Sequence, residues 1–394
     1  MRRSQDLFDR AHNYVEHCRR HWADQPVRAA WNMGLWGFMH MFGSGKSTGK
    51  TASGPVPKIA FILDGGLGDT LVNAFFLRDF FLQCGPMQLD VCTEYPQVFH
   101  ASLAGGDITA RRISADPPDD DCDLILYCLL VPSVVHCNKT RVNHIGSPQL
   151  NAFVDDLETL QKKEPVWFSM QDHFMGAILS YGRLQGRTRA QLPYMAGSLE
   201  PTDMPMPAGP LPKITIPELS DGRPFITVHR GSGSCITSTK LWSGSGYDAL
   251  LDRLRRRFPG ASLVQVGHDN EILLDVDIDL RGRTSLPQLA GLMRDACLHI
   301  ASEGSTVHLR HILCRRPSVV FFGPTDPDFY GYAENCNIRF PYCRSCEWVT
   351  RDWQQSCARG FSSCRSLEKL TPEKVWQSME QHETLLEDLC SRAS

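Results

Sequence analysis

Short apolar runs alternate with glycine-rich turns and amphipathic stretches in the first half of the chain. Three of these runs have the length and composition of buried strands: Ile59–Leu63, Leu89–Cys92 and Leu124–Leu126. A glycine-rich turn, Asp64–Asp69, follows the first run, and apolar residues at helical spacing predict a helix from Thr70 onward. Strands that alternate with helices predict a parallel α/β unit, to which we assign residues 58–215.

The same pattern returns after a proline-rich stretch, Met204–Pro217, which we interpret as a linker or domain boundary. Four runs fit strands: Phe225–Val228, Ser262–Val266, Leu298–Ala301 and Pro317–Phe322. Two amphipathic stretches fit helices: Tyr247–Phe258 and Leu286–Ala296. We assign this second unit residues 222–340. The predicted fold class is therefore α/β, with two Rossmann-like doubly wound domains that face a cleft, and the cleft is where we expect a ligand.

Other segments flank the two units. Residues 1–42 predict a helical N-terminal extension, residues 43–57 a flexible linker, and residues 370–392 a C-terminal helix. Within the extension, the apolar run Ala29–Phe42 is too short to cross a bilayer. It could lie in a membrane interface or pack on its own core, and both interpretations stay open.

One stretch of the linker, Ser44–Thr51, is similar to a phosphate-binding P-loop. Ser44 replaces its first glycine, and the sequence offers neither a strand before it nor an apolar helix after it to hold the backbone around a phosphate. We therefore discard an ATP-dependent activity based on this segment.

Composition indicates a soluble globular protein, because 42% of the 394 residues are hydrophobic and 22% are charged. The formal net charge is −3, and no cluster of Lys or Arg is interleaved with aromatic residues, so we expect no nucleic-acid partner. The charged N-terminus (Arg2, Arg3, Asp6) is unlike a secretory signal peptide. We expect a cytoplasmic location, with peripheral contact at the inner face of the membrane as the alternative, and the oligomeric state stays open.

Four of the fifteen cysteines gather in a Trp-containing segment that we assign to residues 341–366. Cys343 and Cys346 can present two sulfurs from one turn, and Cys357 and Cys364 follow within a short distance. Four thiolates can close a tetrahedral structural site for Fe or Zn, which leaves no open position for water. Four free thiols are the alternative.

A small-residue turn, Glu303–Thr306, precedes His308 at the expected end of a strand. Where such a turn begins a helix, the unpaired backbone N–H groups and the positive end of the helix dipole favour a phosphate or diphosphate. An ordinary capped helix is the alternative interpretation.

Two more side chains are candidates at the cleft. Asp69 lies near an expected helix start, where the dipole favours an ionised carboxylate; it could act as a base or only cap the helix. Lys240 follows a loop that begins at His229, and it could meet the charge of a leaving diphosphate. A lysine more often lies in solvent, so this side chain alone does not decide the function.

Together, six motifs resemble in their order those of the ADP-heptose heptosyltransferases of glycosyltransferase family 9. They are Gly66-Leu-Gly68-Asp69-Thr-Leu71, Thr239-Lys240-Leu-Trp242, Gly267-x3-Glu271, Leu280–Leu286, Glu303–His308 and Phe322–Pro327. The resemblance runs from Lys58 to Pro327 and is strongest after Phe225.

The resemblance implies a GT-B fold, in which the first domain holds the acceptor and the second holds a nucleotide-sugar, with an ADP-sugar favoured. It implies that Asp69 is the base of an inverting transfer of a heptose or related sugar to a hydroxyl of a lipopolysaccharide, glycan or protein. Lys240 would steady the diphosphate, and Glu271 would bind the ribose hydroxyls. Further substrate contacts are implied for the remaining motif residues: Gly68, Thr239, Glu303, Gly304, Ser305, Thr306 and His308.

Two further features follow from the resemblance. A helix start and a cation would take the place of a catalytic divalent metal, so none is expected. The C-terminal helix would pack back across the domain junction.

The chain departs from the family pattern at three places. Glu303 stands where Asp is usual, Ser305 stands where Gly is frequent, and the loop from Gly231 to Lys240 looks longer than usual. These differences leave the donor sugar open. The four cysteines resemble the iron site of autotransporter heptosyltransferases in the same family, which keeps a protein acceptor among the candidates.

Two functions of other classes stay as alternatives. One is a non-catalytic sugar-nucleotide-binding protein that has kept the fold. The other is a metal-stabilised scaffold or metal sensor in which the cysteine segment carries the function.

Overall fold

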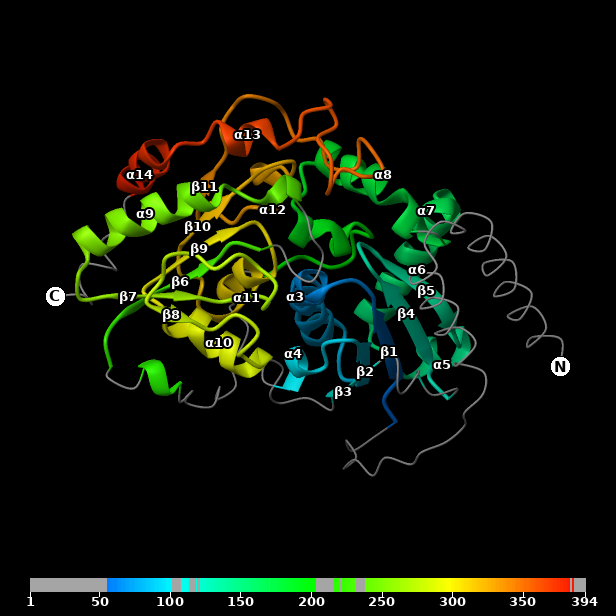
Figure 1. Ribbon diagram of the computed structural model, residues 1–394. Helices are drawn as coiled ribbons and strands as arrows, with labels where there is room; N and C mark the ends of the chain where they lie inside the picture. The colour runs from blue at the N-terminus through cyan, green and yellow to red at the C-terminus, as the bar shows by residue number, and fades with distance from the viewer. Residues whose placement is uncertain are drawn as a thin grey trace.

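The computed structural model describes residues 55–382 and Leu385, with gaps at 101–107, 113–117, 119–120, 170, 203–215, 220–221, 232–237 and 383–384. Several predictions therefore lie outside the described residues: the extension 1–42, the stretch Ser44–Thr51, most of the linker 43–57 and of Met204–Pro217, and the longer loop before Lys240. Figure 1 shows two lobes, each built around one sheet.

The first lobe contains a five-stranded sheet with the order β3-β2-β1-β4-β5. Its strands are β1 (Lys58–Leu63), β2 (Gln88–Thr93), β3 (Ile108–Arg112), β4 (Leu124–Cys128) and β5 (Pro132–Cys137). The four strands β1 to β4 are parallel, whereas β5 pairs antiparallel with β4. The three predicted runs coincide with β1, β2 and β4, whereas β3 and β5 were not predicted, and a wholly parallel unit was wrong at the β5 edge. Only three residues separate β4 from β5, too few for a parallel crossover.

Seven helical segments cover this sheet: α3 (Leu67–Cys84), α4 (Gln97–His100), α5 (Lys139–Ile145), α6 (Pro148–Lys163), α7 (Pro165–Ser169), α8 (Gln171–Leu184) and the 3₁₀ turn η1 (Arg189–Tyr194). Helix α3 begins at Leu67 rather than at the predicted Thr70. Gly65 has a φ of +103° and reverses the chain early, so Asp69 falls inside the first turn of the helix.

The second lobe contains a six-stranded, wholly parallel sheet with the order β11-β10-β9-β6-β7-β8. Its strands are β6 (Phe225–His229), β7 (Ser262–Gln265), β8 (Ile278–Asp279), β9 (Leu298–Ser302), β10 (Ser318–Phe321) and β11 (Cys336–Ile338). Its helical segments are η2 (Pro217–Leu219), η3 (Ser238–Lys240), α9 (Gly244–Arg257), α10 (Leu286–Asp295), α11 (Ser305–Cys314), α12 (Pro327–Tyr330), α13 (Arg365–Glu368) and α14 (Pro372–Gln381). All four predicted strands and both predicted helices are present.

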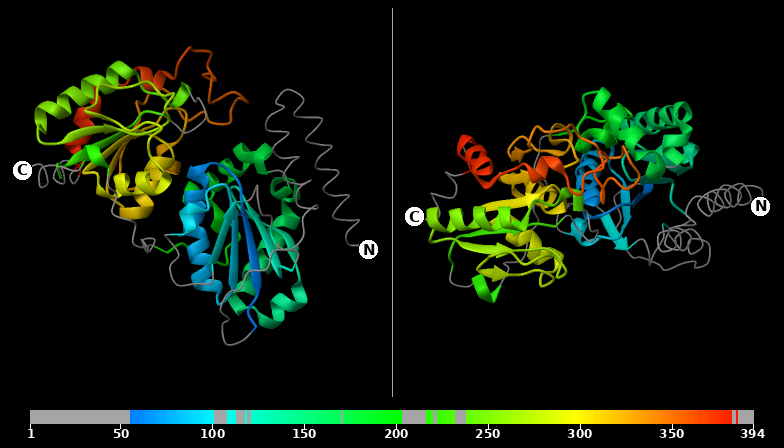
Figure 2. Two further views of the ribbon diagram at one scale, coloured as in Figure 1. Left: turned by 60° about the horizontal axis from the view of Figure 1, so that its bottom comes forward. Right: turned by 45° about the horizontal axis from the view of Figure 1, so that its top comes forward.

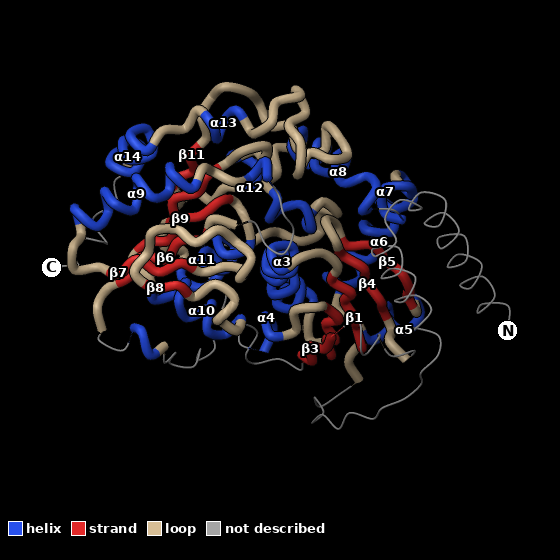
Figure 3. The backbone as a smooth tube through the Cα atoms, viewed as in Figure 1, coloured by secondary structure: helices blue, strands red, loops and turns tan. Residues whose placement is uncertain are grey.

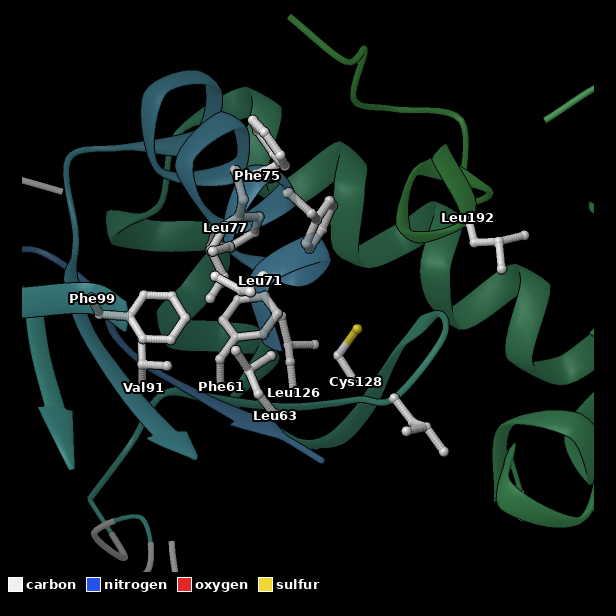
Figure 4. Packing of buried hydrophobic residues seen from close by; sticks show 14 of the residues in the cluster. Phe61, Leu63, Leu71, Phe75, Leu77, Val91, Phe99, Leu126, Cys128 and Leu192 are labelled. Carbon is white, nitrogen blue, oxygen red and sulfur yellow. The ribbon is translucent and has the colours of Figure 1, made fainter. Parts of the chain in front are cut away.

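The core of the first lobe forms where α3 packs on β1 and its neighbours. Figure 4 shows Phe61 and Leu63 of β1 directed toward Leu71 and Leu77 of α3, all of them buried. The rings of Phe61 and Phe80 meet edge to face with centroids 5.1 Å apart, a geometry that aromatic pairs prefer. This packing fixes α3, and with it Asp69, on the sheet.

The two lobes meet where α3 contacts α11, as the paired views of Figure 2 and the tube of Figure 3 show. The rings of Phe75 on α3 and His311 on α11 lie 5.4 Å apart, and Leu309 and Ile312 of α11 belong to the same buried cluster as α3. The starts of these two helices follow β1 and β9, so the carboxyl edges of the two sheets face one another.

Helix α14 packs on its own lobe. Val375, Trp376 and Met379 are buried against a cluster that includes residues of α9 and β11. The prediction that the C-terminal helix crosses the domain junction is therefore wrong for its described part, Pro372–Gln381. Its apolar face is already covered by α9 and has nothing left to bury on the first lobe. Among the described helices, none combines the length and apolarity that crossing a membrane requires.

Candidate active site between the lobes

Asp69 lies at the mouth of the interlobe junction, in the first turn of α3. Its Oδ2 accepts a hydrogen bond from the Gly66 backbone N–H at 3.2 Å, and its side chain keeps 33% of its surface exposed. A Cβ on Gly65 would lie 2.9 Å from both Cβ and Oδ2 of Asp69. The glycine turn is therefore needed so that the chain can pass close to this carboxylate.

Arg189 is the partner of Asp69, and sequence reasoning missed it. Its Nη2 donates to Asp69 Oδ1 at 2.8 Å and to the Leu129 carbonyl at 3.1 Å, while only 4% of the side chain is exposed. Its Nη1 is buried without a hydrogen-bond partner among the described residues. No local pattern marks Arg189, because it comes to the site from η1, 120 residues after Asp69.

His308 brings the second lobe to the same place. A Cβ on Gly68 would lie 3.3 Å from the His308 ring and 3.7 Å from Cα of Ser305, so the first turns of α3 and α11 are in contact. Nδ1 of His308 and the hydroxyl of Tyr332 lie 2.7 Å apart. Burial lowers the pKa of His308 to about 4, although the negative charges of Glu303 and Asp69 oppose this shift. The ring is therefore neutral near pH 7.

Lys240 is held inside the site rather than in solvent. Its Nζ lies 2.6 Å from Oε2 of Glu303 and 5.7 Å from the centre of the Trp353 ring. Only 15% of the Lys240 side chain and 7% of the Glu303 side chain are exposed. Burial would raise the pKa of Glu303, but the charge of Lys240 and hydrogen bonds from Lys240 and Thr325 lower it below its usual value. The site therefore contains an ionised Glu303 and an adjacent cation.

The Thr239 hydroxyl does not face this site. It donates to the backbone carbonyls of Trp353 and Gln354, each at 3.0 Å, and the residue is buried. Thr239 thus ties the segment before Lys240 to the cysteine-rich loop, and the substrate contact that the resemblance implied for it stays a prediction.

Glu271 lies in the loop after β7 and is almost covered. Its Oε1 accepts from the His268 backbone N–H at 2.9 Å and lies 3.3 Å from Nε2 of His229, and its Oε2 accepts from the Gly231 N–H at 2.9 Å. Burial would raise the pKa of Glu271, but these hydrogen bonds and the His229 charge lower it. A carboxylate has about four acceptor positions, and these three contacts use most of them.

The turn before α11 places its members in different surroundings. Gly304 is the N-cap in extended backbone, and Ser305 is half-buried at the first position of the helix. The Thr306 hydroxyl is buried between two imidazoles, those of His229 and His299. The side chain of Thr306 is thus used inside the protein, while its backbone N–H stays in the first turn of the helix.

The four cysteines lie in one neighbourhood, on a loop that contacts both lobes. Burial raises the pKa of Cys346 to about 11, and the charges of Cys364, Cys343 and Cys357 each add to that rise. Yet no group of three or more His, Cys, Asp or Glu side chains in the described part of the chain has the spacing of metal ligands. The donor types fit a tetrahedral thiolate site, and the metal itself stays a prediction.

This cysteine-rich loop also reaches the first lobe. Arg183 of α8 forms an ion pair with the buried Glu347, and a Cβ on Gly176 would lie 2.8 Å from Cβ of Trp348. The loop is thus packed between α8 and the segment that carries Lys240.

Solved structures match this chain, whereas comparisons of its sequence with protein families and with curated proteins find no match. The iron-containing dodecameric glycosyltransferase TibC from enterotoxigenic E. coli H10407 superposes with a TM-score of 0.55, at 15% identity, over 84% of this chain and 77% of that chain. The chain shares the fold of this glycosyltransferase. The predicted GT-B architecture is thereby confirmed.

Two other solved structures are similar. TibC in complex with ADP-D-β-D-heptose gives a TM-score of 0.52, at 16% identity, over 84% of this chain and 77% of that chain. E. coli ADP-heptose LPS heptosyltransferase II gives 0.47, at 17% identity, over 84% of this chain and 99% of that chain.

Proposed function

We propose that the protein is an inverting glycosyltransferase that moves a heptose or a related sugar from an ADP-sugar to a hydroxyl of its acceptor. The observation that carries this proposal is the contact between the starts of α3 and α11, where Gly68, next to Asp69, meets His308 and Ser305, and where the charges of Asp69 and Glu303 both act on the His308 ring. The shared fold supports it, since TibC is a glycosyltransferase and has been solved with ADP-D-β-D-heptose.

Asp69 is the base in this proposal. Its half-exposed carboxylate takes the proton from the acceptor hydroxyl as that oxygen attacks the anomeric carbon, while the bond to the diphosphate breaks on the opposite face. One displacement inverts the anomeric configuration. Arg189 fixes one carboxylate oxygen through Oδ1, which leaves Oδ2 to receive the proton.

The leaving diphosphate is stabilised by the second lobe. Lys240 supplies a cation that is almost buried, and such a charge is worth more there than in water. The first-turn N–H groups of α11 supply further donors. His308 is neutral near pH 7 and adds no charge to the site. These groups replace a catalytic divalent metal.

The cysteine-rich loop has a structural role in the proposal. Cys343, Cys346, Cys357 and Cys364 would hold one Fe or Zn ion, which would fix the loop against Thr239 and α8. TibC is described as iron-containing and dodecameric, and both an iron site and an oligomer are proposals for this chain. A glycan, a lipid-linked sugar or a protein can serve as acceptor in this scheme, at a cytoplasmic site or on the inner face of the membrane.

The donor class can be tested by thermal shift. The purified full-length protein is mixed with ADP-, UDP- and GDP-sugars, and its melting temperature is measured with each. A ligand that binds only the native state raises stability by mass action, so we expect the largest rise with an ADP-sugar. A larger rise with a UDP- or GDP-sugar would contradict the proposed donor.

A further inference from the structure

A buried chain of hydrogen bonds crosses the second lobe beneath the proposed donor site. Oγ1 of Thr227 lies 3.0 Å from Nδ1 of His299, whose Nε2 lies 3.0 Å from Oγ1 of Thr306. The Thr306 hydroxyl lies 3.1 Å from Nδ1 of His229, whose Nε2 lies 3.3 Å from Glu271. The four residues before Glu271 in this chain of hydrogen bonds are buried, each with at most 3% of its surface exposed.

The direction in which each hydrogen bond of this chain is donated is assigned by starting from Glu271. Glu271 is ionised and only accepts, so Nε2 of His229 carries a hydrogen, and the relay takes the His229 tautomer whose Nδ1 has no hydrogen and accepts. The Thr306 hydroxyl then donates to His229 and accepts from Nε2–H of His299. Burial lowers the pKa of His299 well below its usual value, so a ring with its hydrogen on Nε2 has a bare Nδ1, which lies 3.0 Å from the Thr227 hydroxyl; that hydroxyl also lies 3.4 Å from the Leu298 carbonyl. Each hydrogen thus has an acceptor.

The chain connects three parts of the donor site. Thr227 and His229 belong to β6, Thr306 belongs to the first turn of α11, and Glu271 follows β7. Ligands of parallel α/β sheets bind beyond the carboxyl ends of such strands. Glu271 extends the chain by holding the backbone N–H groups of Gly231 and His268. A Cβ on Gly267, which has a φ of +134°, would lie 2.6 Å from the same carboxylate.

We propose that His299, Thr306 and His229 form a positioning relay that holds Glu271 and the first turn of α11 in the geometry that binds the nucleotide of the donor. The relay residues act through Glu271 and the helix, and they do not touch the reacting atoms. This inference rests on the proposed function, because it assigns the relay to the nucleotide part of that site.

Thr306 offers a matched pair of substitutions. Thr306→Val keeps the shape but removes the hydroxyl, whereas Thr306→Ser keeps the hydroxyl. We expect Thr306→Val to weaken ADP binding about tenfold, since two buried imidazole nitrogens lose their partner, and Thr306→Ser to stay within about twofold of the wild type. Ser133→Ala removes a buried hydroxyl from the other lobe and should leave ADP affinity unchanged. Affinity is measured by titration calorimetry with ADP.

The outcomes separate this inference from the proposed function. If the wild type does not bind ADP, both fail. If the wild type binds ADP and Thr306→Val binds it equally well, the relay fails and the donor assignment stands. Equal losses in Thr306→Val and Thr306→Ser would also overturn the relay, because they would point to packing rather than to the hydroxyl.

A second measurement uses the wild-type protein alone, so it needs neither a ligand nor a substituted variant. In ¹⁵N-histidine-labelled wild-type protein, nitrogen chemical shifts report which ring nitrogen carries the hydrogen. The relay requires the Nε2–H form for both His229 and His299. The Nδ1–H form at either ring would turn an acceptor of the relay into a donor, and this result would overturn the proposal.

Discussion

Arg189 donates from Nη2 to Oδ1 of Asp69 across 2.8 Å and thereby fixes the carboxylate that we assign as the base. The contact is made by a buried guanidinium, which a second hydrogen bond to the Leu129 carbonyl holds in place. A guanidinium that is already fixed by burial and by this second bond loses little entropy when it orients its partner. Arg189 is therefore a positioning residue for the proposed reaction.

Replacing Arg189 tests this role. Arg189→Lys keeps the positive charge but loses the planar fork, so we expect kcat to fall about tenfold while the affinity for ADP stays within about twofold. Turnover is followed as release of ADP from the ADP-sugar, with a cell extract as the source of acceptor. A rise in KM of about tenfold with an unaltered kcat would contradict a role through Asp69.

Asp69→Asn removes the base while keeping the shape. General base catalysis contributes about 10²- to 10⁴-fold, so we expect ADP release to fall by that factor while ADP binding persists. Asp64→Asn is the matched control, since Asp64 lies in the same turn but contacts the Gly65 N–H and the Tyr127 hydroxyl. Unchanged turnover in Asp69→Asn would contradict the assignment of Asp69 as the base, whereas a wild type that binds ADP but releases none from an ADP-sugar would favour the alternative of a non-catalytic binding protein.

Lys240 and Glu303 form a nearly buried ion pair whose two roles can be separated. Lys240→Met leaves Glu303 buried without its cation, which costs about 3–5 kcal/mol in such pairs. We expect the double variant Lys240→Met with Glu303→Gln to regain most of that stability, but not the affinity for ADP. Chemical unfolding gives the free energies and calorimetry gives the affinity. If the double variant bound ADP like the wild type, Lys240 would have no part in holding the diphosphate.

Local pattern was sufficient for most of the fold. Apolar runs such as Ile59–Leu63 predict strands because a parallel strand is buried on both faces. The start of α3 was missed because Gly65 turns the chain before the apolar spacing begins. The antiparallel β5 was missed because its short connection to β4 lies in a continuous apolar stretch, which hides the strand boundary.

The site was predictable only where residues are neighbours in the sequence. Asp69 and Lys240 stand in motifs, and the structure has Asp69 in the first turn of α3 and Lys240 paired with Glu303. Arg189 could not be found, because its role depends on a contact across 120 residues. The same holds for Thr306: the sequence shows a hydroxyl at a helix start but not the two histidines that enclose it.

The cysteine-rich loop predicts a link between metal content and donor binding. We expect about one Fe or Zn ion per chain, and its loss in Cys346→Ser or Cys364→Ser. Because the carbonyls of Trp353 and Gln354 hold Thr239 next to Lys240, loss of the ion should also weaken ADP binding. Elemental analysis and calorimetry measure the two effects.

Cys137→Ser is the matched control for these variants, since Cys137 is half-buried in the first lobe. It should retain the metal and the affinity. A metal-free wild type that still binds ADP would contradict the structural site.

His308 predicts how stability depends on pH. Its pKa is about 4 in the folded protein, whereas an unfolded histidine has a pKa of about 6.5. The unfolded state therefore binds more protons between these values, so the His308 contribution is complete above pH 6.5 and is lost as the pH falls toward 4. We expect His308→Gln to reduce the fall in the free energy of unfolding over this window by roughly 1–3 kcal/mol. His299→Gln should reduce it in the same direction, because burial also lowers the pKa of that ring. Urea unfolding at a series of pH values measures both, and an unaltered slope in His308→Gln would mean that folding does not lower the pKa of this ring.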